Sequence, residues 1–221
     1  MKYQVTVDEA LGETRVALSS NCYTDAFPLV NTLILRKQDI DTRSQALPLA
    51  VALLTAPYCG EIFEFEGIRI GNDYAEAIRR VIGRDVTVLG VDGMHRKTST
   101  GEVDIQCEKA SAGSRSRPAA RPEDSVPLAR VDWSGDPVDR ATRNSSDSAQ
   151  GAIHTNAALF ADETTVSVAI ALLYGRDSVR TIYVPGVEGG DAVVERIARA
   201  LRPVSVGVDA VWEEPAPSLA P

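Results

Sequence analysis

The spacing of apolar residues divides the chain into short runs typical of strands and longer runs typical of helices. Two β-rich runs, 61–67 and 180–186, each end in glycine, as half-buried strands often do. After each run, at 73–82 and 192–201, apolar residues recur at the spacing of one helix face. The pattern also predicts further strands near 33–37, 86–91, 157–161 and 204–208.

Two more apolar stretches, 47–56 and 166–175, fit either a helix or a strand. Their alanines and leucines favour a helix, and Pro48 suits the first helical position. The alternating start of the second stretch is also typical of a strand. We interpret both as helices.

The two halves of this pattern match each other along the sequence. Residues 48–82 align without a gap onto 167–201 with nine identical positions, where chance would supply roughly two or three. After a two-residue deletion the match resumes, with 90–92 against 207–209. We interpret this match as an internal duplication. The alternative is that any two α/β segments share such a pattern.

Each copy is predicted to be a β-α-β-α-β unit, which gives an α/β fold with two pseudo-equivalent halves and mostly parallel sheets. We expect a first repeat over 1–107, a flexible linker over 108–127, a second repeat over 128–212 and a disordered tail over 213–221. Units of this size bury small cores. We therefore expect the two copies to associate and to bury their most apolar runs, which contain Val51, Leu54, Ile170 and Leu173. Five aromatic residues are expected to complete the core or its edges: Trp133, Tyr23, Tyr58, Tyr183 and Trp212.

Composition and charge narrow the class of protein. A net charge of −8 disfavours nucleic-acid binding and attraction to an anionic membrane. No apolar run reaches the ~18 residues that span a bilayer, and the first residues do not resemble a secretory signal. The three cysteines are widely spaced, which argues against a disulfide scaffold and for the cytoplasm. The two histidines lack metal-binding spacing, so no metal site is expected.

Two glycine loops follow predicted strands and open predicted helices, a position where backbone N–H groups can bind an anion. Their candidate ligand-binding residues are Gly67, Gly71, Asn72, Gly186 and Gly190. Neither loop has a nucleotide-binding fingerprint, so no cofactor can be named. The simpler interpretation, which we favour, is that these glycines turn the chain out of a strand.

Candidate catalytic residues fall in two places. Asp92 and Asp209 end equivalent predicted strands, where open α/β sheets bind ligands, although aspartate is also a common turn residue. The polar segment 132–156 adds Asp136, His154 and Asn156 as a base or orienting groups. Its counterpart, residues 19–25, contains Cys22 as a candidate thiol nucleophile. No nucleophile elbow is present.

Two hypotheses from different classes follow. The first is an accessory or binding protein, acting as a subunit or adaptor, because no complete catalytic constellation is present in the sequence. The alternative is a small-molecule enzyme with a site between the halves. We favour the accessory protein, with a protein partner or a small molecule as ligand and a homo-oligomer as a further option.

Overall fold

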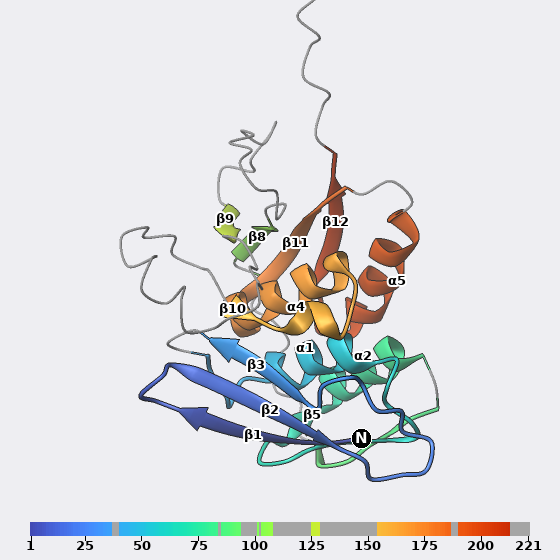
Figure 1. Ribbon diagram of the computed structural model, residues 1–221. Coiled ribbons are helices and arrows are strands. Elements are labelled where there is room, and N and C mark those ends of the chain that lie inside the picture. The colour runs from blue at the N-terminus through green and yellow to red at the C-terminus, as the bar shows by residue number, and fades with distance from the viewer. Residues whose placement is uncertain are drawn as a thin grey trace, which may run out of the picture.

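The computed structural model describes residues 1–36, 40–83, 85–93, 101, 103–107, 125–128, 154–186 and 190–212. These residues form four layers, seen from the side in Figure 1. A mixed sheet forms one outer layer, two layers of helices lie next to it, and a parallel sheet forms the other outer layer. The fold is therefore α/β, and most of its strand pairings in the described residues are parallel.

The mixed sheet begins as an antiparallel meander of β1 (Lys2–Asp8), β2 (Glu13–Ser19) and β3 (Thr32–Arg36). The short strand β10 (His154–Thr155) pairs antiparallel with β3 at one edge. On the other side of β1, strands β4 (Ile62–Phe65) and β6 (Thr87–Val88) add in parallel. The strand order is β10-β3-β2-β1-β4-β6. A separate parallel ladder joins β5 (Ile70–Gly71) to β7 (Val91–Asp92).

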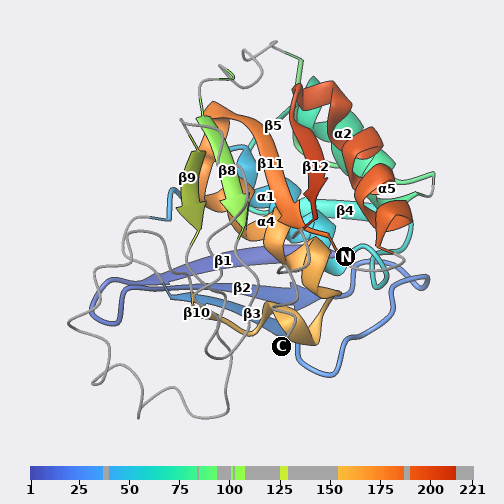
Figure 2. The ribbon, with the colours of Figure 1, turned by 90° about the horizontal axis from the view of Figure 1, so that it is seen from above.

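The second sheet is parallel throughout. It contains β8 (Val103–Cys107), β9 (Ser125–Leu128), β11 (Val179–Pro185) and β12 (Gly207–Val211) in the order β12-β11-β8-β9. Figure 2 shows these strands side by side, with α4 (Glu163–Gly175) beneath them. Parallel sheets of this kind are covered by helices, and here α4 packs on β8 and β11 while α5 (Asp191–Leu201) packs on β12.

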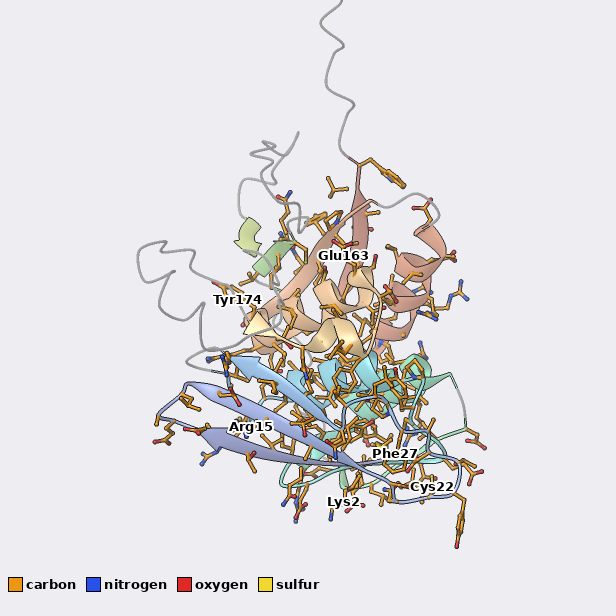
Figure 3. The ribbon with its side chains drawn as sticks, in the orientation of Figure 1. Lys2, Arg15, Cys22, Phe27, Glu163 and Tyr174 are labelled. Atoms are coloured by element: carbon orange, nitrogen blue, oxygen red, sulfur yellow. The ribbon has the colours of Figure 1, made fainter. Side chains whose placement is uncertain are left out.

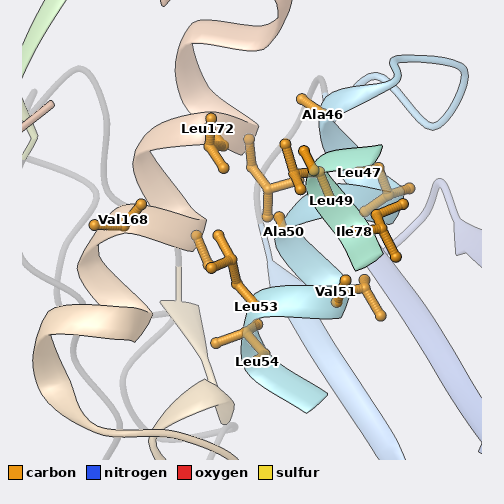
Figure 4. Close-up of a cluster of buried hydrophobic side chains, with 14 of the residues drawn as sticks. Ala46, Leu47, Leu49, Ala50, Val51, Leu53, Leu54, Ile78, Val168 and Leu172 are labelled. Atoms are coloured by element: carbon orange, nitrogen blue, oxygen red, sulfur yellow. The ribbon is translucent and has the colours of Figure 1, made fainter. Parts of the chain in front are cut away.

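Two apolar helices form the centre of the molecule. All ten residues of α1 (Ala46–Thr55) are buried, which is expected for a helix that is apolar on every side. Helix α1 packs against α4, and Leu53 and Leu172 extend into the space between the two helices (Figure 4). Val51, Leu54, Ile170 and Leu173 are all buried. The prediction that these runs would be buried is confirmed.

The outer helices, α2 (Asn72–Ile82) and α5, are amphipathic and pack against each other. Helix α2 buries Tyr74 and Ile78 and ends at Gly83, whose positive φ of 67° allows its N–H to cap Arg79 O. Both helices begin as the sequence predicts, within one residue, with Gly71 and Gly190 as N-caps. Three short 3₁₀ helices complete the described elements: η1 (Ala157–Leu159), η2 (Arg176–Ser178) and η3 (Arg202–Val204).

Three predicted strands differ from the structure. Residues 157–161 begin as η1 and not as a strand. The side chain of Asn156 bonds to Ile34 N–H and Thr32 O, and these are the backbone groups of β3 with which a longer β10 would pair. The strand predicted near 204–208 begins later, at Gly207, because η3 takes up the preceding residues. The strand at 86–91 is divided into β6 and β7 by a bend at Gly90, which has a φ of 73°.

The two halves of the sequence interlock. Strands β1, β4 and β6 lie in the same parallel order as β8, β11 and β12, with α1 and α2 matching α4 and α5 along the chain. However, β8 precedes the predicted linker and pairs with strands of the second half, whereas β10 follows the linker and pairs with β3. The duplication and the domain boundaries stay predictions. Of the linker, the described residues include only 125–127, which lie in β9.

Within the described ranges, no helix is both long enough and apolar enough to cross a membrane.

Candidate functional site

The segment between β2 and β3, residues 20–31, carries the most exposed apolar side chains among the described residues. We call it the apolar loop. Tyr23 is 109% exposed, Leu29 99% and Phe27 64%. Figure 3 shows Phe27 and Cys22 together at one end of the mixed sheet. Single exposed apolar residues are ordinary on protein surfaces, but groups of them mark interaction sites.

The backbone of the apolar loop is fixed by the buried carboxylate of Asp25. Its Oδ2 accepts hydrogen bonds from the backbone N–H groups of Asn21 (2.9 Å) and Cys22 (3.2 Å). Its Oδ1 accepts from Gly60 N–H (2.8 Å) and from the amino group of Met1 (2.9 Å). Burial alone would raise the pKa of Asp25, but these hydrogen bonds outweigh it and lower the pKa strongly. The loop is therefore held by an ionised, well-satisfied carboxylate.

The loop also lies unusually close to the segment after α1. A Cβ placed on Gly60 would lie 2.2 Å from Thr24 Oγ1, so only glycine fits at this contact. Thr24 Oγ1 accepts a hydrogen bond from Glu61 N–H (3.1 Å), and Ala26 N–H donates to Tyr58 O (2.9 Å). Such contacts fix the loop conformation while its large apolar side chains remain in solvent.

A groove continues from the end of the apolar loop. It has a volume of about 640 Å³ and reaches from Pro28 to the exposed side chain of Leu159 on η1. Its floor includes Asn156, whose Oδ1 accepts from Ile34 N–H (2.8 Å) and whose Nδ2 donates to Thr32 O (2.8 Å). Both ends of this candidate catalytic amide are thus engaged by the backbone of β3, which gives Asn156 a structural role.

Cys22 is the partly exposed cysteine of the loop. Its sulfur lies 3.2 Å from Thr24 Oγ1, and this hydrogen bond lowers the pKa of the thiol. A thiol nucleophile needs a group that accepts its proton. A hydroxyl is not a general base, and Asp25 is a poor one because its pKa is so low. The described residues therefore do not give Cys22 a base.

The predicted acids are not brought together. Asp92 lies in β7 opposite Gly71, whereas Asp209 is exposed in the middle of β12 opposite Tyr183. These two strands belong to different ladders. The backbone of His154 pairs with Arg36 at the edge of the mixed sheet. Asp136 lies outside the described residues.

The residues of the first glycine loop have structural roles in the turn that precedes α2. Gly67 has a φ of 83°, a conformation that favours glycine. Gly71 N–H donates to the side chain of Gln45 (2.8 Å), which in turn donates to Arg69 O (2.7 Å). Asn72 follows as the first residue of α2. With its N–H bonded to protein, Gly71 is not available to an anion.

The second loop is described only at its ends, because 187–189 lie outside the described residues. A Cβ on Gly186 would lie 2.6 Å from the ring of Trp212, so this glycine makes room for packing. Gly190 O accepts hydrogen bonds from Val193 and Val194 at the start of α5. Among the described residues, no group of three or more His, Cys, Asp or Glu side chains could hold a metal ion.

Comparison with protein-family models, with curated proteins and with solved structures found no match.

The sequence prediction that Tyr23 lies in the core or at its edge is wrong, and the apolar loop was not predicted as a site. Tyr23, Phe27 and Leu29 share the two-residue spacing of a strand, but Asp25 and Pro28 between them disfavour a strand. Large apolar residues in a polar segment with such strand-breaking residues are candidates for a binding surface.

Proposed function

We propose that this protein is a non-catalytic accessory subunit that binds a protein partner through the apolar loop. The observation that carries the proposal is the contrast between a fixed backbone and fully exposed side chains at Tyr23 and Leu29. The duplicated α/β scaffold, which we retain as part of the proposal, serves to present this loop.

Aromatic side chains on an ordered backbone suit the centre of a protein interface. Tyrosine and phenylalanine each bury roughly 150–250 Å² on binding, and such residues dominate interface energetics. A loop that is already ordered loses little conformational entropy when it binds. The Asp25 anchor and the close contact at Gly60 supply that order before a partner arrives.

The charges near the loop indicate the chemistry of the partner. The backbone N–H of exposed Glu61 donates a hydrogen bond to Thr24 of the loop. The side chain of partly exposed Glu64 accepts a weak hydrogen bond from Asn21 (3.4 Å). The whole chain carries a net charge of −8. A complementary partner therefore presents an apolar surface with lysine or arginine at its edge. All three cysteines are free, which suits a reducing compartment, so we place this interaction in the cytoplasm.

Gentle co-purification of three matched forms tests the proposal. The parent chain is compared with Tyr23→Ser/Phe27→Ser/Leu29→Ser and with Val7→Ser/Leu11→Ser, which removes two exposed apolar residues (53% and 60%), one near the end of β1 and one in the β1–β2 turn. A protein that co-purifies in equal amounts with the parent and the β1–β2 variant, and is lost from the loop variant, supports the proposal. A partner retained by the loop variant contradicts it, as does self-association of the purified parent that the loop variant abolishes.

A further inference from the structure

A second cavity lies where the two layers of helices meet, and Leu159 lines both this cavity and the groove that continues from the apolar loop. It has a volume of about 530 Å³, within the range of about 300–1,000 Å³ found for small-molecule sites. Helices α2 and α5, which pack side by side in Figure 2, supply one wall, and η1 with the start of α4 supplies another. Residues of both halves line it, as the hypothesis of a small-molecule site between the halves requires.

Most of the cavity wall is apolar. It includes Leu53 and Pro57 near the end of α1, Val81 of α2, Phe160 after η1 and Ile197 of α5. Three polar side chains complete the lining: Asp162, Thr165 and Arg196. An apolar wall with a few polar groups is the usual composition of a ligand site.

The carboxylate of Asp162 is already satisfied. As the N-cap of α4 it accepts hydrogen bonds from Thr165 N–H (2.9 Å) and from Thr165 Oγ1 (2.7 Å). These bonds also use the Thr165 hydroxyl as a donor. Thr165 thus engages both carboxylate oxygens of Asp162, while the negative charge of Asp162 remains at this wall of the cavity.

Arg196 differs from Asp162 and Thr165, and from Arg199 on the same helix, in the partners of its side chain. Arg199 pairs with Glu195 at 2.6 Å, whereas the side chain of Arg196, exposed at the cavity wall, has no hydrogen bond or ion pair with any described residue. An arginine guanidinium matches the two oxygens of a carboxylate. Among the described residues that line it, the cavity thus combines apolar side chains with one cation that has no side-chain partner.

We infer that this cavity binds a small amphiphilic carboxylate, with its apolar chain against Leu53 and Ile197 and its carboxylate on Arg196. No residue of the apolar loop lines this cavity, so the inference is tested independently of the proposed protein partner. Octanoate is a suitable probe because it has an apolar chain and one carboxylate.

Calorimetric titration of the full chain with octanoate, below the concentration at which it forms micelles, tests the site. We expect saturable binding that Arg196→Gln weakens about tenfold or more, because a hydrogen-bonded charge pair is lost. The matched control Arg199→Gln changes binding less than twofold. Two further ligands separate the contributions: 1-octanol keeps the chain without the charge, and acetate keeps the charge without the chain. Both are expected to bind far more weakly than octanoate.

A variant that fills the cavity tests its location. Ala158 is exposed and lines the cavity, so Ala158→Phe is expected to block octanoate while leaving the melting temperature close to that of the parent. The inference is overturned if the parent shows no saturable binding, if Arg196→Gln and Arg199→Gln have equal effects, if 1-octanol binds as well as octanoate, or if Ala158→Phe binds octanoate normally.

Discussion

The anchor of the apolar loop gives a quantitative prediction. In Asp25→Asn the side chain keeps one oxygen, but its amide nitrogen replaces Oδ2 and faces the backbone N–H groups of Asn21 and Cys22. The two backbone N–H donors would then face the N–H₂ donor of the new amide, and the negative charge of the carboxylate would be lost. Hydrogen bonds to charged groups each contribute about 1.5–3 kcal/mol to stability. Because the Cys22 bond is long at 3.2 Å, we take the lower end of that range for each bond and expect a total loss of about 3 kcal/mol.

Urea denaturation at pH 7 measures this loss as a change in the free energy of unfolding. Asp209→Asn is the matched control, because Asp209 is exposed and its side chain has no hydrogen bond or ion pair with the described residues. Surface substitutions of that kind usually change stability by less than about 0.5 kcal/mol. Hydrogen exchange of the Asn21 and Cys22 amides should also accelerate in Asp25→Asn. An unfolding free energy for Asp25→Asn within about 0.5 kcal/mol of the control would refute the anchor.

Two other features of the structure give predictions of their own. Gly186→Val should lower the free energy of unfolding by about 1–3 kcal/mol, since the added atoms must displace the ring of Trp212. Tryptophan fluorescence during urea denaturation measures this loss. A denaturation midpoint equal to that of the parent would show that the ring moves freely. The second concerns pH. Burial alone would raise the pKa of Glu13, but hydrogen bonds from Arg36 and Arg15 lower it, and a hydrogen bond from Arg180 lowers the pKa of Asp104. Both carboxylates therefore add stability above their unfolded pKa values of about 4, which is lost as the pH falls through the lowered folded values. The melting temperature should therefore stay nearly constant between about pH 5 and 7 and fall below about pH 4. A constant melting temperature down to about pH 3 would contradict the assignment.

Local patterns in the sequence predict most of the helices and only part of the sheets. The amphipathic spacing of α2 and α5 and the apolar runs of α1 and α4 depend on neighbouring residues, so they are visible along the chain. Sheet pairing depends on residues far apart. Nothing near β8 indicates that it joins β11, and nothing near β10 indicates that it ends on β3.

The candidate site was harder to predict for the same reason. Asn156 looks like a reactive polar residue in the sequence, but contacts with β3, more than 100 residues away, make it a structural bridge. Tyr23 looks like a core residue, because aromatic residues are usually buried when a chain can bury them. Its exposure follows from the anchoring of the loop by Asp25 and Gly60, a long-range contact that no local period reveals.

Photocrosslinking from within the apolar loop tests the central claim most directly. A photoreactive phenylalanine analogue replaces Tyr23 in one variant and Val7 in another, and both are irradiated in the cells that produce the protein. Both positions are exposed, Tyr23 at 109% and Val7 at 53%, so position 7 controls for nonspecific crosslinking from an accessible surface site. The account predicts one discrete crosslinked protein from position 23 and none of that protein from position 7. The same crosslinked proteins from both positions, or none from position 23, would contradict it.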